Sequence, residues 1–451
     1  MSKQDSPLVL GNEKVGKLLI QYALPAIVAM TASSLYNMAD SIFIGHGVGA
    51  LGIAGLALTF PLMNLAAAFG SLVGVGASAI ISVKLGQKDY DSANRVLGNV
   101  VVLNGILGIF FTLICLPVLD QILYFFGASD ETLPYARDYM EIILVGNVVT
   151  HMHLGLNNVL RASGAPKYSM YATLASVVIN CILNPIFIFG MGWGIKGSAW
   201  ATVISQVISL AWQISYFSNP KQFLHFKKGI YKLKKDLVTS IFGIGLSPFL
   251  MNICSSLIII LINRGLKEYG GDMAIGAYGI VNRITFLFVM IIMGLNQGMQ
   301  PIAGYNFGAR QFGRVKEVFK QTIIYAVGIA SSGFLIAHLI PSVIVRMFTS
   351  DQDLIEASVY GLHIVFAVFP LVGLQMVIVN FFQSIGKARK AIFLSLTRQA
   401  IFLIPCLLIL PPLSGALGVW ISLPIADSIS VIISYIVLRN QFKKFNHPQT
   451  L

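Results

Sequence analysis

Long uninterrupted apolar stretches constrain this sequence more than any other feature. Residues 53–81, 96–116, 241–262 and 391–410 each reach the roughly 20 residues that a helix needs to cross a bilayer. Barrel strands would be shorter and would alternate apolar with polar residues. Only 11% of the 451 residues are charged, which is too few for the surface of a water-soluble protein of this size. The sequence therefore predicts an all-α polytopic membrane protein.

Twelve membrane spans are predicted, six in each half of the chain. In the first half they cover residues 17–44, 54–83, 93–117, 134–156, 167–190 and 197–218. In the second half they cover residues 237–264, 274–302, 317–345, 355–382, 389–411 and 415–440. The predicted domains are an N-lobe over residues 1–218, a cytoplasmic linker over 219–236 and a C-lobe over 237–451.

Basic residues fall in alternate connections between the predicted spans. Most of the 31 Lys and Arg residues lie on one side of the membrane, which the positive-inside rule makes cytoplasmic. We therefore expect a multi-pass protein of the cytoplasmic (inner) membrane with both termini in the cytoplasm. Topology explains the net charge of +13, so lipid is an expected partner and nucleic acid is not. The oligomeric state is not indicated by the sequence.

Similar short motifs recur at a nearly constant distance along the chain. Leu24-Pro25 corresponds to Ser247-Pro248, residues 83–86 correspond to 305–308, and residues 161–164 correspond to 383–386. An offset that stays near 222 residues predicts a duplication of six-helix halves. Because six is even, the halves are parallel and are related by a pseudo-twofold axis along the membrane normal. This geometry is typical of a carrier that works by rocking alternating access.

A carboxylate lies within the first predicted span. Asp40 shares one helical face with Ser33, Tyr36 and Asn37, which precede it by seven, four and three residues. An acid inside a membrane either marks an ion or substrate pathway or is satisfied by hydrogen bonds between helices. Asp40 is therefore the main candidate for a cation-coupling group, with Tyr36 and Asn37 as candidate neighbours.

The fifth and sixth spans carry polar stripes as well. Asn180 and Asn184 lie one turn apart, and Pro185 follows them and frees a backbone carbonyl of the preceding turn. Thr202 lies on a Ser/Thr stripe, although such stripes also occur as ordinary packing contacts between membrane helices. We predict that Asp40, Asn180, Asn184 and Thr202 surround a small polar pocket for H⁺ or Na⁺. No other metal and no cofactor is expected.

The second half has a different set of charged residues. Asn263 is the repeat equivalent of Asp40, so this half lacks the corresponding acid. Its own acid is Asp427 in the last span, and Arg283 and Arg398 are bases within predicted spans. These four residues are secondary candidates. Asp427 either takes part in coupling or forms a structural ion pair with an arginine.

Sequence motifs of common enzymes are absent. No Walker A, Gly-x-Ser-x-Gly or His-Glu-x-x-His sequence occurs, so neither an ATPase nor a standard hydrolase is supported. We therefore expect a protein that is not an enzyme. A membrane-embedded enzyme or a passive channel remains a remote alternative.

The chain resembles the multidrug and toxic compound extrusion (MATE) family, in its DinF-like and MepA-like branches, over nearly its whole length. The resemblance implies two six-helix lobes and a secondary antiporter that exports small amphiphilic, in particular cationic, organic compounds in exchange for H⁺ or Na⁺. It also implies a coupling role for Asp40 and a cation pocket that includes Asn180 and Thr202. The motifs that carry it are Leu24-Pro25, residues 40–45 (DSIFIG), Leu85-Gly86-Gln87, residues 160–164 (LRASG), residues 184–190 (NPIFIFG) and residues 301–306 (PIAGYN).

Two positions depart from the family pattern. Many relatives carry an aspartate where Asn184 stands, and MepA-like members have an acid in the eighth span near Asn296. The loss of both acids argues against a two-carboxylate sodium site and favours protons. The nearest alternative function is a flippase of a lipid-linked saccharide in the same superfamily, which would use bases such as Arg283 and Arg398 to meet pyrophosphate.

Overall fold

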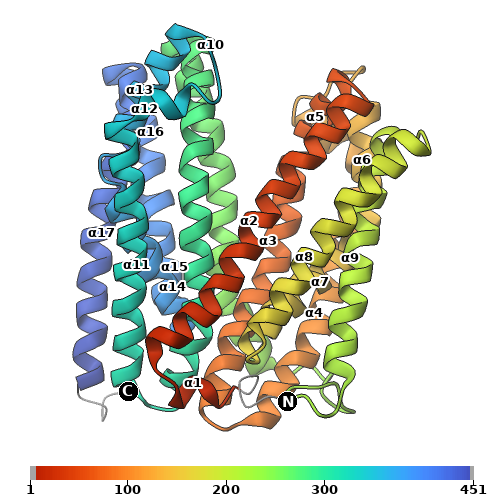
Figure 1. Cartoon of the computed structure of the whole chain (residues 1–451), viewed down its shortest axis with the longest axis vertical. Helices are drawn as coiled ribbons and strands as arrows, with labels where there is room; N and C mark the ends of the chain where they lie inside the picture. Colours follow the sequence, from red (N-terminus) through yellow and green to blue (C-terminus); the bar gives the residue numbers. More distant parts are fainter. Residues whose placement is uncertain (1–6, 447–451) are drawn as a thin grey trace. The chain divides into compact units, whose positions relative to one another are not determined.

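The structure is built from helices. The computed structural model describes residues 7–446, and no β-strand occurs among them. The helices divide into two compact units. Unit 1 comprises the residues up to Glu13 and Val28–Phe249, and unit 2 comprises Lys14–Ile27 and the residues from Leu250 onward. The long helices of each unit run side by side (Figure 1).

Unit 1 is formed mainly by the first half of the chain. Its apolar core lies between the inward faces of several helices, where Ile44, Leu62, Tyr139 and Ala199 are almost completely buried. The elements are α1 (Val9–Asn12), α2 (Val15–Gly47), α3 (Ala50–Gly86), α4 (Tyr90–Cys115), η2 (Leu116–Val118), α5 (Leu119–Phe125), α6 (Leu133–Val145), α7 (Asn147–Ala162), α8 (Pro166–Pro185), η3 (Ile186–Gly190) and α9 (Gly194–Ser218).

Unit 2 is formed mainly by the second half. Its first element, α10 (Lys235–Gly308), breaks at Gly271, where φ is +68° and a side chain would be strained. The break separates two spans, Lys235–Gly271 and Met273–Gly308. The later elements are α11 (Phe312–Leu339), α12 (Pro341–Val345), α13 (Gln352–Phe366), α14 (Phe369–Ser384), α15 (Ala388–Leu396), η4 (Thr397–Leu403), α16 (Ile404–Ser414) and α17 (Ala416–Asn446).

Each of the twelve predicted spans coincides with a helix or with consecutive helices of the described chain. Nine of these segments are long and apolar enough to cross a membrane, and α13 with α14, bent by 50°, makes a tenth. The other two predicted spans are α6 with α7, and α9. α6 and α7 are each too short to cross a membrane alone, and these two spans contain buried polar side chains such as His151, Asn157 and Thr202. The predicted all-α polytopic membrane fold is confirmed.

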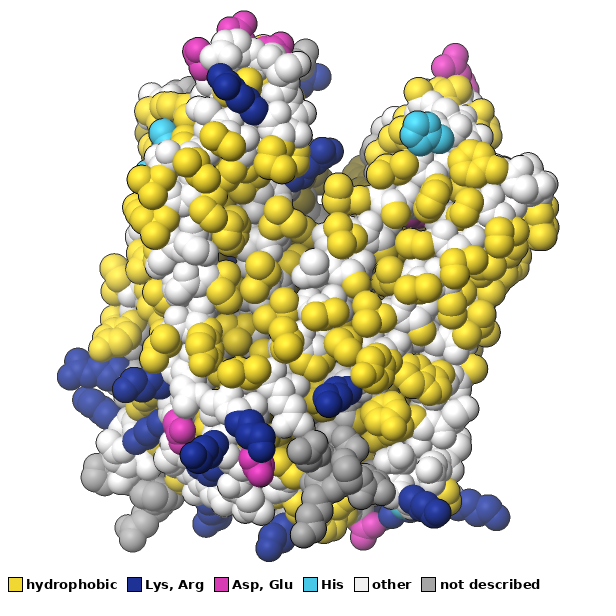
Figure 2. Space-filling view, in the orientation of Figure 1, with side chains coloured by type: hydrophobic (Ala, Val, Ile, Leu, Met, Phe, Trp, Pro, Cys, Tyr) yellow, Lys and Arg dark blue, Asp and Glu magenta, His cyan; other side chains and the backbone are white. Residues whose placement is uncertain are grey.

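The surface of each unit shows how it fits a membrane. Figure 2 shows hydrophobic side chains over most of the length of each unit, and many Lys and Arg side chains near the lower end in that view. Apolar side chains suit contact with lipid tails, and basic side chains suit one membrane interface. The predicted cytoplasmic location of the two termini concerns residues 1–6 and 447–451, which lie outside the described residues.

The segment between α9 and α10, residues 219–234, folds against unit 1. We call it the linker. Asn99 on α4 donates from Nδ2 to the carbonyl oxygens of Ile230 at 3.3 Å and Lys232 at 3.2 Å. Leu224 and Ile230 of the linker are buried, with exposed fractions of 1% and 4%. The linker is therefore a packed part of unit 1 and not a free spacer.

Candidate functional site

Three helices of unit 1 bring polar side chains to one buried point. Asp40 lies on α2, Asn180 and Asn184 lie on α8, and Thr202 lies on α9. The exposed fractions are 5% for Asp40, 1% for Asn180, 0% for Asn184 and 6% for Thr202. α2 is far from α8 and α9 in the sequence. The structure thus brings together the four residues that were predicted to share a pocket.

A continuous chain of hydrogen bonds links these side chains. Asn184 Nδ2 donates to Asp40 Oδ1 at 3.0 Å and to Asn180 Oδ1 at 2.7 Å. Asn180 Nδ2 donates to Thr202 Oγ1 at 3.1 Å. The Thr202 and Tyr36 hydroxyls share a hydrogen bond of 3.0 Å. Because hydrogen bonds in such a chain polarise one another, a change of charge on Asp40 alters the strength of the hydrogen bonds as far as Tyr36.

Two further residues complete the site, and neither was among the predicted site residues. Ser198 Oγ donates to Asp40 Oδ1 at 2.5 Å. Tyr139 on α6 has an exposed fraction of 1% and interacts with Thr202. Ser198 lies one turn before Thr202 on the polar stripe of the sixth span, and that spacing was the available signal. Nothing in the sequence distinguishes Tyr139 from an ordinary core aromatic residue.

The Asp40 carboxylate has only neutral partners. Within the described residues, no Lys, Arg or His forms an ion pair with it. A buried carboxylate without a basic partner is destabilising unless a proton or a bound cation neutralises it. Asn184 Oδ1 is also buried, and in the described part of the chain it accepts no hydrogen bond. Asp40 Oδ2 accepts none among the described contacts either, because both donors bind Oδ1. These two oxygens are therefore available to an ion.

The helix that carries both asparagines changes its winding beside the site. Pro185 has no amide hydrogen, and the next residues, Ile186–Gly190, form the π-helical turn η3. Phe187 and Ile188 of this turn are buried and fix it in the core. Asn184 is thus held at the last regular turn of α8, next to the kind of π-bulge that is frequent at functional sites.

Asn37, predicted on the same face of α2 as Asp40, lies outside the network. Its side chain is exposed and has no hydrogen bond among the described contacts, while its carbonyl oxygen accepts from Ser41 Oγ at 3.0 Å. Residues three apart on a helix differ in direction by about 60°. That difference places Asp40 inside unit 1 and Asn37 at its surface.

The charged candidates of unit 2 form an ion pair. Arg398 Nε donates to Asp427 Oδ1 at 2.5 Å, and the exposed fractions of these side chains are 25% and 7%. Arg398 lies in the π-helical segment η4, and its neighbour Gln399 donates to Ser255 Oγ at 3.0 Å. Of the two arrangements expected for Asp427, the structure contains the ion pair. A coupling role for Asp427 stays a prediction.

The other two candidates of unit 2 do not join this pair. Arg283 and Asn263, both on α10, are exposed, and neither forms an ion pair or a side-chain hydrogen bond among the described contacts. Asn263 therefore does not reproduce the environment that its repeat equivalent Asp40 has in unit 1. The buried polar networks of the two halves differ in position and in charge.

A multi-pass helical fold with an internal repeat and an intramembrane acid held by neutral groups defines a membrane transporter. A family model described as MatE matches residues 25–186 and 247–409, which is one segment in each half of the chain. This chain belongs to the MatE family. Members of this family are transporters and not enzymes, and the same holds for this protein.

Curated relatives agree with this assignment. "Multidrug export protein MepA" of Staphylococcus aureus (strain MSSA476) is 33% identical over 426 residues, which covers 94% of this chain and 93% of the relative. The protein of the same name from Staphylococcus haemolyticus (strain JCSC1435) is 31% identical and covers 97% of both chains.

Solved structures show the same fold at lower identity. "Crystal structure of MATE in the bent conformation" superposes with a TM-score of 0.93 at 23% identity, with 100% of both chains covered. "Outward-facing conformation of a multidrug resistance MATE family transporter of the MOP superfamily" superposes with a TM-score of 0.92 at 24% identity and covers 98% of this chain and 99% of that chain.

Proposed function

We propose that this protein is a secondary active antiporter that exports small amphiphilic organic cations in exchange for protons. The buried Asp40 carboxylate, bonded by the neutral groups of Asn184 and Ser198, is the observation that carries this proposal. An acid without a basic partner gains or loses a cation with a large change in its interaction energy. That change is what couples an ion gradient to a conformational cycle.

The hydrogen-bond pattern of the Asp40 network favours protons over sodium ions as the coupling ion. The amide nitrogen of Asn184, and not its oxygen, faces Asp40 Oδ1. Asn180 Oδ1 already accepts a hydrogen bond from the same amide. A sodium ion needs several oxygen ligands at once, whereas a proton needs only the carboxylate. Among the described contacts, Asn184 Oδ1 and Asp40 Oδ2 are the amide and carboxylate oxygens of the network that accept no hydrogen bond, which is fewer oxygen ligands than a sodium ion needs.

The substrate class follows from charge and from the relatives. The relatives in the two staphylococcal species carry the name multidrug export protein, and a protein with that name handles chemically varied compounds. A buried acid in apolar surroundings attracts a positively charged amphiphile. The flippase alternative relies on Arg283 and Arg398, yet Arg398 is engaged by Asp427 and only Arg283 is exposed.

The experiment is transport of a fluorescent organic cation in proteoliposomes under an imposed pH gradient or an imposed sodium gradient. We expect the wild type to accumulate the cation under the pH gradient and D40N to lose this accumulation. Asparagine keeps the hydrogen bonds of the site but cannot bind a proton, so expression and folding are expected to be retained. The matched control is D138N, because Asp138 is an acid of unit 1 that pairs with Lys196 at 3.3 Å on a partly exposed surface.

The two variants separate the possible results. If D40N still accumulates the cation, Asp40 has no part in the mechanism. Accumulation driven by the sodium gradient alone would show that the coupling ion is sodium and not the proton. If neither gradient drives the organic cation in any variant, transport of a lipid-linked saccharide becomes the function to test.

A further inference from the structure

An apolar cavity of about 400 Å³ lies inside unit 1 beside the linker. Its walls come from α4, α7 and α9, and Phe226 and Tyr231 of the linker close one side. No charged side chain lines it. Ile214 on α9 and Tyr231 have exposed fractions of 42% and 44%, so the cavity reaches the surface there. The site described above has no residue in common with this cavity.

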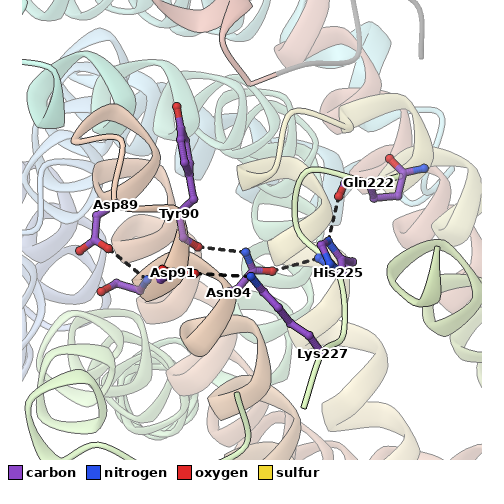
Figure 3. A network of polar contacts seen from close by, with 8 residues as sticks. Asp89, Tyr90, Asp91, Asn94, Gln222, His225 and Lys227 are labelled. Atoms are coloured by element: carbon purple, nitrogen blue, oxygen red, sulfur yellow. Dashed lines mark hydrogen bonds and ion pairs between the residues drawn. The ribbon is translucent and has the colours of Figure 1, made fainter. Parts of the chain in front are cut away.

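Specific contacts hold the linker side of the cavity in place. Figure 3 shows Asn94 of α4, whose Oδ1 accepts a hydrogen bond from the backbone amide of His225 at 3.1 Å. In the same figure Lys227 approaches Asp91 at 3.5 Å. The Phe226 ring lies 5.8 Å from that of Phe217 at the end of α9. The wall is therefore built by the fold and does not depend on a ligand.

A cluster of aromatic residues lies at the same end of α9 as the lining residue Ile214. The Tyr168 ring is 6.0 Å from that of Trp212 and 4.9 Å from that of Tyr216. Tyr216 in turn contacts Phe217, the ring partner of Phe226. Tyrosine and tryptophan concentrate where lipid headgroups meet acyl chains. This end of unit 1 is thus placed at a membrane interface, with the cavity on its apolar side.

The linker, which supplies the lining residues Phe226 and Tyr231, also carries a dense positive charge. Apart from Lys227, it carries exposed Lys221, Lys228, Lys232 and Lys234, and none of these four forms an ion pair within the described residues. Clusters of four to eight basic residues next to a membrane helix attract anionic lipids, and each residue strengthens binding by roughly fivefold. The same charge repels a cationic export substrate. The positive-inside rule alone accounts for the basic residues of the linker, but it does not account for the cavity beside them.

We propose that this cavity binds one acyl chain of an anionic phospholipid, whose phosphate headgroup is held by the lysines of the linker. The apolar walls exclude a polar ligand, and the lysines select a negative headgroup at the cavity mouth. Because Phe226 and Tyr231 belong to the linker, the bound lipid fastens the linker to α4, α7 and α9. The site is thus a structural lipid site of unit 1, separate from the transport pathway.

Native mass spectrometry of the purified full-length protein tests this proposal, with phosphatidylglycerol and phosphatidylethanolamine titrated separately. We expect phosphatidylglycerol to bind more tightly than phosphatidylethanolamine. K228Q/K232Q/K234Q is expected to weaken phosphatidylglycerol binding by up to about a hundredfold, because each lysine removed is worth roughly a fivefold change. The matched control is R439Q/K443Q/K444Q, which removes the same charge from exposed positions at the end of α17 in unit 2. This control is expected to bind both lipids like the wild type.

A second pair of variants tests the cavity itself. V149F replaces the lining residue Val149 with a larger side chain that fills part of the cavity, and it is expected to weaken the binding of both lipids. V178F is the control, because it adds the same volume at a position of α8 that is 54% exposed. Equal losses of binding in K228Q/K232Q/K234Q and R439Q/K443Q/K444Q, or unchanged binding in V149F, would overturn the proposal. Full competition by glycerol 1-phosphate, which lacks acyl chains, would also overturn it and leave only an anion site.

Discussion

The orientation of one amide decides what the unit 1 site can bind. Asn184 donates to both Asp40 and Asn180 through Nδ2, at 3.0 Å and 2.7 Å, and keeps Oδ1 without a hydrogen bond in the described chain. The amide therefore stabilises the carboxylate as a donor and contributes no negative charge. A carboxylate at the same position would add a second anion about as close to Asp40 and would require a cation between them.

This reasoning gives a first prediction, that N184D makes transport sodium-dependent. Two carboxylates with Thr202 and Asn180 offer the oxygen ligands that a hard cation needs. We expect external sodium to raise efflux by N184D about tenfold, equivalent to ~1.4 kcal/mol, and to leave wild-type efflux unchanged. Efflux measured against external sodium in proteoliposomes checks this. N37D is the control, since it adds the same charge to α2 outside the network; an equal sodium response in N37D would contradict the assignment.

The second prediction concerns the ion pair of unit 2. Removal of one member of a buried pair leaves an unpaired charge and typically costs about 3–5 kcal/mol, while removal of both costs much less. We expect D427N and R398Q each to lower the Tm of the purified protein more than the double variant D427N/R398Q does. R283Q, at an exposed position outside the pair, is expected to leave Tm unchanged. A double variant that is less stable than both single variants would show that Asp427 and Arg398 act independently.

The sequence predicts the members of the unit 1 network well and their exact contacts poorly. Helical spacing places Tyr36 with Asp40 and Asn180 with Asn184, and the structure joins all four. The same spacing cannot distinguish Asn37, because a rotation of about 60° separates a buried from an exposed position. Contacts between helices, such as that of Ser198 with Asp40, depend on packing that no single helix encodes.

At the scale of elements, the linker is the least predictable part of the fold. Its composition is rich in Lys and polar residues, which is typical of a solvated connection. The structure instead packs it on α4, because Gly98 lets the backbone of Ile230 approach closely. A Cβ added at Gly98 would lie 2.4 Å from the Ile230 carbonyl oxygen. One small residue thus permits a contact that composition does not reveal.

The third prediction tests this contact with two glycines of α4. G98A is expected to destabilise the docked linker by about 1–3 kcal/mol, because backbone atoms cannot yield to the new methyl group. G105A meets only Met152 Cε at 3.6 Å and is expected to be neutral or stabilising by up to about 1 kcal/mol through helix propensity. The rate of tryptic cleavage within the linker checks both variants. Equal cleavage rates in G98A and G105A would show that the linker does not depend on this approach.

At the scale of the whole molecule, the units do not follow the sequence halves strictly. Lys14–Ile27, the first part of the first span, belongs to unit 2, and the start of α10 up to Phe249 belongs to unit 1. The internal repeat extends to these exchanged segments. A Cβ added at Gly298 would lie 2.5 Å from Ala23 Cα within unit 2, and one added at Gly76 would lie 2.0 Å from the Ile241 carbonyl oxygen within unit 1.

Gly76 and Gly298 are 222 residues apart, so they are repeat equivalents, and the fourth prediction is that they respond alike to alanine. G76A and G298A are each expected to lower the free energy of unfolding by about 1–3 kcal/mol, since both methyl groups meet backbone atoms. Both are also expected to reduce gradient-driven efflux, because the close helix contact at each glycine joins segments from different halves of the chain. G328A, which meets no atom within 4 Å, is the control and is expected to keep wild-type stability and efflux. A loss of stability and efflux in only one of the two variants would show that the two repeat-related helix contacts no longer have the same role.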